Sequence, residues 1–148
     1  MDRAFGDYVI STDRQRLDVR AIHEFLAERS YWARGVALDT VEKSIAGSLP
    51  FGAYRGDEQV GFARVVTDRA TFAWLADVFI LESERGSGLG KALIACVMDH
   101  PDVSGVRRHL LATRDAHGLY ARYGFEPLER SERFMVIEPP ATLPPHER

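Results

Sequence analysis

The hydrophobic and polar positions of this chain change period several times, and each change predicts a boundary between elements. A short apolar run at residues 8–10 is typical of a strand. Behind Asp18, apolar residues recur every three or four positions, which predicts a helix with Asp18 as its N-cap. Thr40 begins a second segment with helical spacing. The runs at 51–55 and 59–67 are typical of strands, and the polar turn between them predicts a hairpin.

The second half of the chain alternates between strand and helix patterns. A long strand is predicted from about residue 71 to 81, followed by a glycine-rich turn and an amphipathic helix that ends near His100 and Pro101. The remaining predicted elements are a strand at 109–113, a helix at 116–123 and a last strand at 134–137. This order of elements predicts a mixed α/β fold.

Length and composition narrow the class of protein. With 148 residues, 45% hydrophobic and 28% charged, the chain is typical of one soluble domain. We place that domain at residues 1–138 and expect the proline-rich residues 139–148 to form a flexible tail. A net charge of −3 indicates no nucleic-acid partner, and no apolar run approaches the roughly 20 residues that span a membrane. The single cysteine, Cys96, fits a reducing compartment, so we expect a cytoplasmic protein.

One segment, Arg85-Gly86-Ser87-Gly88-Leu89-Gly90-Lys91, lies where the long predicted strand turns into a helix. Glycine has no Cβ, so main-chain amides at these positions can approach a ligand closely. The first turn of a helix also presents unpaired N–H groups and the positive end of the helix dipole. With Arg85 and Lys91 at its two ends, the segment predicts a site for a phosphate or pyrophosphate group.

Two common phosphate-binding loops do not fit this segment. A Walker loop ending at Gly90-Lys91 requires glycine at position 85 and a hydroxyl residue at position 92, but the chain has Arg85 and Ala92. A dinucleotide fingerprint starting at Gly86 requires glycine at position 91, where the chain has Lys91. The spacing therefore argues against an NTPase and against an NAD-binding protein.

Two motifs together resemble the GNAT superfamily of N-acetyltransferases. Arg85, Gly88 and Gly90 match its Arg-x-x-Gly-x-Gly signature, and Leu119-Tyr120-Ala121-Arg122-Tyr123-Gly124-Phe125 is similar to its Leu-Tyr-x-x-x-Gly-Phe element. The resemblance extends from about residue 8 to 137. It implies a mixed, mostly antiparallel central sheet flanked by helices. In that fold, two parallel strands splay apart to form the cleft for an acyl-coenzyme A.

The resemblance also implies the co-substrate, acetyl-CoA, and its contacts. Its pyrophosphate is expected on the amides of residues 86–91, flanked by Arg85. Its pantetheine arm is expected to pair with the strand edge at Val78, Phe79 and Ile80. Thr113 stands where the family often has an asparagine that touches the cofactor, and can replace that contact only partly. No histidine has the spacing of a metal ligand, so no metal is expected.

In this family, the acetyl group passes by direct attack of an amine on the thioester. The resemblance aligns Tyr120 with the general acid that protonates the departing thiolate, although a core tyrosine would show the same pattern. Asp77 is a candidate base, but it would equally form a cross-strand ion pair with Arg64. A chain of water molecules is an equally good base. Cys96 shares the apolar helix face, which argues against a cysteine nucleophile.

The acceptor is the least determined part of the prediction. Tyr31 and Trp32 lie beside the predicted N-terminal helices, where family acceptor sites are found, and either form a wall of that site or close the core. We expect an N-acetyltransferase of a primary amine, with a small molecule or a peptide as acceptor. The alternative is a non-catalytic module that binds acyl-CoA as a sensor or scaffold. A homodimer is a further possibility, since dimers are common among similar proteins.

Overall fold

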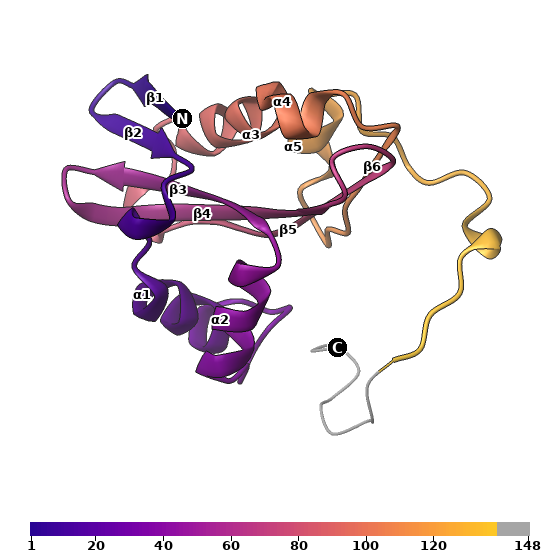
Figure 1. Cartoon of the computed structure of the whole chain (residues 1–148), viewed down its shortest axis with the longest axis horizontal. Helices are drawn as coiled ribbons and strands as arrows, with labels where there is room; N and C mark the ends of the chain where they lie inside the picture. Colours follow the sequence, from indigo (N-terminus) through magenta and orange to yellow (C-terminus); the bar gives the residue numbers. More distant parts are fainter. Residues whose placement is uncertain (139–148) are drawn as a thin grey trace.

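A central sheet organises the molecule in the computed structural model, which describes residues 1–138; the expected proline-rich tail lies outside the described residues. The strands are β1 (Asp2–Phe5), β2 (Tyr8–Ser11), β3 (Leu49–Arg55), β4 (Glu58–Thr67), β5 (Phe72–Ile80) and β6 (Arg108–Leu110). They follow one another across the 6-stranded sheet in chain order, as Figure 1 shows. All neighbours are antiparallel except β5 and β6, which are parallel. The predicted mixed α/β class is confirmed.

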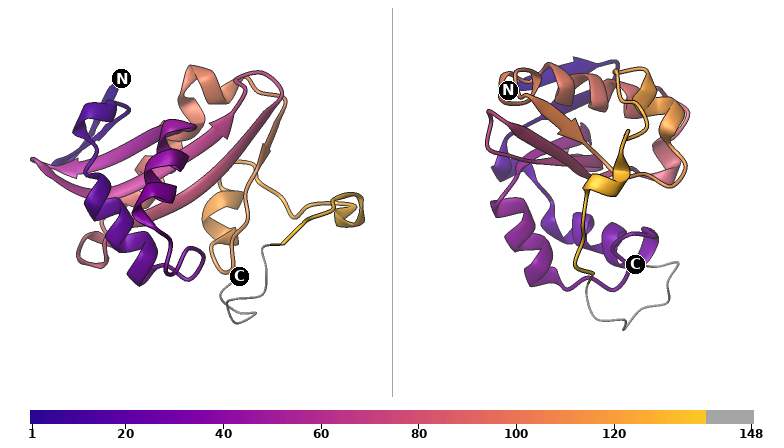
Figure 2. Two further views of the ribbon diagram at one scale, coloured as in Figure 1. Left: turned by 60° about the horizontal axis from the view of Figure 1, so that its bottom comes forward. Right: turned by 90° about the vertical axis from the view of Figure 1, so that its right-hand side faces the viewer.

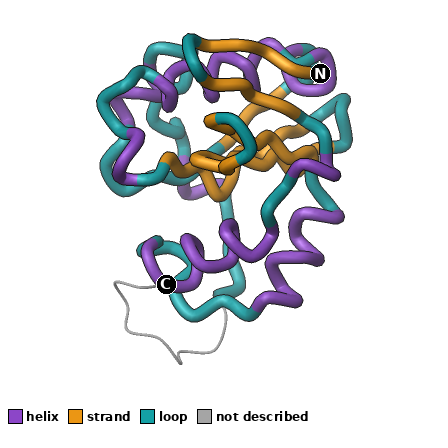
Figure 3. The backbone as a smooth tube through the Cα atoms, turned by 90° about the vertical axis from the view of Figure 1, so that its left-hand side faces the viewer, coloured by secondary structure: helices purple, strands orange, loops and turns teal. Residues whose placement is uncertain are grey.

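Helices cover both faces of this sheet. The elements on one face are α1 (Val19–Glu24), its π-helical continuation η2 (Phe25–Arg29) and α2 (Leu38–Ala46). Those on the other are α3 (Leu89–Asp99), α4 (Pro101–Ser104) and α5 (His117–Ala121). Short 3₁₀ turns are η1 (Arg14–Arg16), η3 (Glu82–Glu84) and η4 (Ser131–Arg133). The two helical layers are seen on either side of the strands in Figures 2 and 3.

Each helical layer encloses its own apolar core against the sheet. The larger core joins α3 to β2–β5 and includes the fully buried Leu93 and Val97. The smaller one joins α1 and α2 to the opposite face, where Phe25 stacks on Phe79 with ring centroids 3.9 Å apart. Because both faces are covered, β4 is an almost continuous buried run instead of an alternating one. Asp18 caps α1 as predicted, its carboxylate accepting from the amide of Ala21 at 3.0 Å.

A β-bulge interrupts the pairing of β4 with β5 and shapes the cleft. The register shifts between Phe62 and Arg64, so that Asp77 and Val78 together oppose a single residue of β4. Asp77 has a φ of 54°, a left-handed conformation that the bulge imposes on it. On its other edge, β5 pairs with β6 only as far as Trp74, although β5 continues to Ile80. The splay of two parallel strands is therefore present.

The structure corrects several predicted boundaries. It adds β1, which pairs with β2, and it begins α2 at Leu38 instead of Thr40. β6 ends at Leu110 instead of residue 113. The prediction of a last strand at 134–137 is wrong, because these residues belong to no strand and their side chains are exposed. An apolar run satisfies the pattern of a strand, but a strand also needs a neighbour to accept its main-chain hydrogen bonds.

Candidate functional site

The glycine segment forms a tight loop that ends in the first turn of α3. Gly86 and Gly88 have φ values of 83° and 85°, which favour glycine, and Gly88 is the N-cap of α3. The Ser87 hydroxyl donates to the carbonyl of Glu84 at 2.8 Å and accepts from the amide of Leu89 at 3.3 Å. The two hydrogen bonds of the Ser87 side chain therefore stabilise the conformation of the loop.

The main-chain amides of this loop are available to a ligand. Within residues 1–138, no protein group accepts from the amides of Gly86, Ser87, Gly88, Gly90 and Lys91. Arg85 directly follows η3, and its Nε donates to the carbonyl of Ile80, the last residue of β5, at 3.2 Å. Unpaired amides at a helix N-terminus with a guanidinium beside them form a site suited to an anion.

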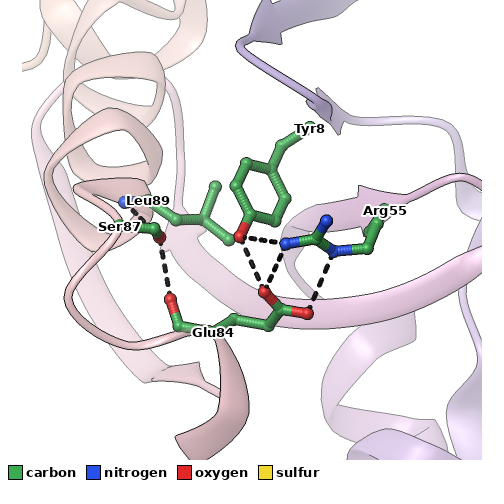
Figure 4. A network of polar contacts seen from close by, with 5 residues as sticks. All are labelled: Tyr8, Arg55, Glu84, Ser87 and Leu89. Carbon is green, nitrogen blue, oxygen red and sulfur yellow. Dashed lines mark hydrogen bonds and ion pairs between the residues drawn. The ribbon is translucent and has the colours of Figure 1, made fainter.

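A network of polar contacts fixes the start of the loop to the sheet (Figure 4). Glu84 accepts hydrogen bonds from the Tyr8 hydroxyl at 2.6 Å and from both Nε and Nη2 of Arg55, at 3.1 and 2.8 Å. Arg55 also donates to the Tyr8 oxygen at 2.8 Å. The hydrogen bonds from Arg55 and from Tyr8 hold the pKa of Glu84 below its ordinary value, so this carboxylate stays ionised. The loop thus begins from a point anchored to β2 and β3.

The edge of β5 next to the loop has main-chain groups without a strand partner. The amide of Leu81 donates to Val60 on the β4 side at 2.9 Å. Because main-chain groups alternate along a strand, those of Val78 and Ile80 point to the opposite edge, which β6 has already left. An extended ligand with amide groups can pair there as a short additional strand. Phe79 lies between them, and its own side chain packs on Phe25 in the smaller core.

A cavity of about 610 Å³ opens between β5 and the segment that follows β6. Its lining includes these residues predicted from the sequence: Tyr31, Trp32, Asp77, Val78, Thr113 and Tyr120. The structure therefore brings the proposed acid, the candidate base and the aromatic pair into one site. The glycine loop lies outside this cavity, beyond the far end of the β5 edge.

Tyr120 lies on α5, and its ring is buried. Within the described chain, its hydroxyl makes no hydrogen bond to a protein group. Its ring meets Phe125 edge to face, with centroids 5.9 Å apart. Burial, with a smaller contribution from Tyr31, raises the pKa of Tyr120 to about 12. The phenol is therefore protonated at neutral pH and available as a hydrogen-bond donor in the cavity.

Asp77 is held by two donors from different elements. One carboxylate oxygen accepts from Arg64 Nε at 2.6 Å, and the other accepts from Trp32 Nε1 at 2.8 Å. Arg64 is fixed in turn by the Ser48 hydroxyl, 3.0 Å from its Nη1. The cross-strand ion pair considered from the sequence is therefore present, and it orients the Trp32 ring at the cavity.

Two features of the cavity were not predicted from the sequence. The amide of Arg114 donates to the Tyr31 hydroxyl at 3.0 Å, and the Arg114 guanidinium lies 3.9 Å from the centroid of the Tyr31 ring. This contact joins segments 83 positions apart, and no local pattern indicates it. The hydroxyl of Thr113 accepts from the amide of Ala116 at 3.0 Å, a capping contact typical of a threonine just before a helix.

Other groups weighed in the sequence are placed away from the chemistry. Cys96 is buried on α3, and burial raises the pKa of its thiol, which disfavours the reactive thiolate. Among residues 1–138 there is no cluster of metal-ligating side chains. In the same part of the chain, no helix has the length and hydropathy needed to cross a bilayer.

Comparison with known proteins gives one consistent family. Residues 46–127 match the family model described as an acetyltransferase (GNAT) domain. A Gibberella zeae protein that carries an acetyltransferase name is 31% identical over 139 residues, covering 79% of this chain and 77% of its own length. A GNAT-family crystal structure from Xanthomonas campestris pv. campestris is 47% identical, with a TM-score of 0.88 over 91% of this chain and 95% of that one. A Mycobacterium tuberculosis structure in complex with CoA shares the fold at 18% identity and a TM-score of 0.67, over 81% and 72% of the two chains.

Proposed function

Because the chain belongs to the GNAT family of acetyltransferases and is an acyltransferase, we propose that it moves an acetyl group from acetyl-CoA directly to a primary amine. The observation that carries this proposal is the unpartnered hydroxyl of Tyr120 in a cavity bordered by the open edge of β5. A module that only binds acyl-CoA needs the loop amides and a strand edge, but it has no use for a proton donor in this cavity.

The proposed position of the co-substrate follows from two sets of main-chain groups, the loop amides and the β5 edge, most of which have no protein partner within the described chain. The amides of residues 86–91, with Arg85 beside them, take the pyrophosphate, and the groups of Val78 and Ile80 pair with the pantetheine arm. The arm then enters the cavity between β5 and the Thr113 side, which brings the thioester next to Tyr120. The Thr113 hydroxyl already accepts from Ala116, so it has its own proton left to offer to the cofactor.

The amine must lose a proton before it attacks, since an ordinary alkylamine has a pKa of about 10.4. Asp77 is the candidate acceptor, because each of its oxygens carries a second lone pair beyond the bond to Arg64 or Trp32. Both oxygens of Asp77 are already held by Arg64 and Trp32, so we propose that water carries the proton from the amine past Asp77 to solvent. Asp77 in this view mainly orients Trp32, which with Tyr31 forms the wall that receives the amine.

Tyr120 completes the transfer by protonating the departing thiolate as the C–S bond breaks. The nitrogen loses its second proton as the amide forms, and water returns that proton to Tyr120. A pKa of about 12 keeps the phenol fully protonated throughout the working range. The thiol of coenzyme A resembles cysteine, with a pKa near 8.5 in water. The same burial that raises the pKa of Tyr120 also makes the thiolate more basic, which brings the two groups closer in proton affinity. Such an acid contributes about 10²–10⁴-fold to the rate.

The experiment compares Tyr120→Phe with Tyr54→Phe in a thiol-release assay over a panel of primary amines and amine-bearing peptides. Both tyrosines are buried and both have a pKa raised to about 12, but Tyr54 lies outside the cavity. We expect Tyr120→Phe to lower kcat by about 10²–10⁴-fold with coenzyme A affinity retained, and Tyr54→Phe to keep its activity. Unchanged turnover in Tyr120→Phe would remove the acid assignment. Coenzyme A binding without thiol release for any amine would instead support the sensor or scaffold function.

A further inference from the structure

The guanidinium of Arg64 lines the cavity and keeps hydrogen-bond donors that the protein does not use. Arg64 lies on β4, and its side chain is only 17% exposed. Of its N–H groups, one on Nε donates to Asp77 and one on Nη1 donates to the Ser48 hydroxyl. Within residues 1–138, no protein group accepts from Nη2. A ligand oxygen in the cavity can therefore bind these remaining donors.

The unused donors are held in position before any ligand binds. The Ser48 hydroxyl, which accepts from Arg64, donates in turn to the carbonyl of Ser44 on α2 at 2.6 Å. On its other side, Arg64 is fixed by Asp77, whose side chain is only 12% exposed. Because a guanidinium is planar, these two contacts also fix the direction of Nη2. Ordered charged donors that are largely shielded from water bind an anionic group more strongly than a mobile surface arginine does.

The aromatic wall of the cavity is already in contact with a cation of the protein itself. The Arg114 guanidinium lies 3.9 Å from the centroid of the Tyr31 ring, and Tyr31 meets Trp32 edge to face with centroids 5.0 Å apart. A charged ammonium group of a ligand would have to compete with Arg114 for that ring. Arg114 and its neighbour Asp115, 3.6 Å apart, are 63% and 69% exposed, so solvent screens this pair. The strongest charged partner for a ligand in this lining is therefore Arg64.

We propose that the acceptor is an amino carboxylate, whose carboxylate binds Nη2 of Arg64 while its amine lies beside Asp77; this inference rests on the function proposed above. The fixed pair of a guanidinium and a carboxylate is complementary to a ligand that carries an amine and a carboxylate. A carboxylate suits the position better than a phosphate, because Asp77 repels the second negative charge of a phosphate. Leu26, Val36 and Val41 line the same cavity, which favours an amino acid with an apolar side chain. The amine nitrogen becomes the amide as described above, and the carboxylate does not react.

The test compares acceptors that differ only in the carboxylate. Leucine is paired with 3-methylbutylamine and phenylalanine with 2-phenylethylamine, and selectivity is the ratio of kcat/KM for the amino acid to kcat/KM for its amine. Arg64→Gln removes the positive charge, so this ratio should fall at least about tenfold. Asp77→Asn removes the negative charge that repels the ligand carboxylate, so the ratio should rise. If the ion pair only held Trp32 in place, both variants would change the two acceptors alike and leave the ratio unchanged.

Two further variants keep the comparison valid. Arg64→Gln leaves Asp77 as a charge without its ion-pair partner, which destabilises a fold, so Arg64→Gln is also combined with Asp77→Asn. Asparagine tolerates the left-handed φ of 54° at this position, and the neutral pair should show the same low ratio as Arg64→Gln. Arg114→Gln is the matched control, since it removes an exposed arginine from the same lining. A fall in the ratio for Arg114→Gln and not for Arg64→Gln would contradict the role of Arg64.

Titration calorimetry with coenzyme A-saturated protein measures amino acid binding without turnover. We expect leucine and phenylalanine to bind, and to bind at least about tenfold more weakly to Arg64→Gln. Turnover of both members of a pair with a ratio near one would overturn the carboxylate proposal and leave the proposed function in place. Faster turnover of 2-aminoethyl phosphate than of either amino acid would also overturn it. Binding that depends on Arg64 without thiol release would count against the proposed function alone, and the absence of both binding and turnover would overturn both.

Discussion

Gly88 is the residue at which the phosphate loop becomes α3, and its replacement by alanine perturbs that turn alone. Its φ of 85° is left-handed, and holding an L-residue there costs about 1–2 kcal/mol. An added Cβ would also lie 3.3 Å from Cζ of Phe5, a tight contact that the partly exposed Phe5 ring can relieve by a small shift. We expect Gly88→Ala to lower the free energy of unfolding by about 1–2 kcal/mol, almost entirely from backbone strain.

The matched control is Gly90→Ala, the same chemical change two positions later. Gly90 lies in the first turn of α3, and its added Cβ would meet nothing closer than Cγ1 of Ile80 at 3.8 Å. Because alanine is the better helix former, Gly90→Ala should raise the free energy of unfolding by roughly 0.5–1 kcal/mol. The two variants are therefore expected to have stability changes of opposite sign.

Gly88→Ala and Gly90→Ala also test whether coenzyme A binding depends on the conformation of the loop or only on its having small residues. In Gly88→Ala the loop either keeps its strained turn or relaxes and turns its amides away from the pyrophosphate. If the loop relaxes, coenzyme A must restore the strained turn on binding, and the binding free energy falls by about 1–2 kcal/mol. That loss corresponds to an affinity for coenzyme A about 5–30 times weaker. Urea unfolding followed by circular dichroism gives the stabilities, and titration calorimetry with coenzyme A gives the affinities. A Gly88→Ala protein that matches the unmodified chain in both measurements would refute the assigned role of the loop.

Three further predictions concern the network and the buried tyrosines. Glu84→Gln should raise the KM for acetyl-CoA severalfold and leave kcat unchanged, because it removes the ionised partner of Arg55; a fall in kcat at constant KM contradicts this. Tyr54→Phe should raise the free energy of unfolding by about 1 kcal/mol in urea titrations, because the Tyr54 hydroxyl is buried and has no hydrogen-bond partner within the described residues; a loss of stability contradicts this. Burial raises the pKa of Tyr54 and Tyr120 from 10.0 to about 12, so these tyrosines ionise at lower pH in the unfolded chain than in the folded one. Their contribution to the free energy of unfolding is therefore full below pH 10 and should decline between pH 10 and 12. Each tyrosine accounts for up to about 3 kcal/mol of that decline, and a phenylalanine variant at either position should show a smaller one in urea titrations at each pH.

The phosphate loop could be predicted from the sequence because its geometry is local. Glycines at positions 86 and 88 permit the left-handed turns that the structure contains, and the apolar spacing that follows predicts α3. The positions of Tyr120 and of the splayed strands came from a resemblance between two motifs and a known family. The residues of each motif lie within a few positions of one another, so a pattern along the chain is enough to indicate the loop and Tyr120. The splay of β5 and β6 joins distant segments and followed only from the resemblance.

The cavity depended on contacts that no local pattern contains. The bulge that gives Asp77 its left-handed φ arises from the register between β4 and β5, and the partners of Asp77 come from Arg64 and Trp32. The contact of Arg114 with Tyr31 joins residues 83 positions apart. Such pairings depend on how whole strands align, which is decided by the total packing of the sheet and its two helical layers.

The apolar run at 134–137 shows most clearly where the sequence stops being sufficient. By itself the sequence determined an acyltransferase family, a glycine loop able to hold a phosphate, and strand-forming side chains near the end of the described chain. Only the tertiary structure decided that, among residues 1–138, this last segment belongs to no strand and β6 pairs with β5 alone. The reason is that side-chain pattern expresses the preference of each residue, whereas a strand exists only where a second main chain supplies its hydrogen bonds.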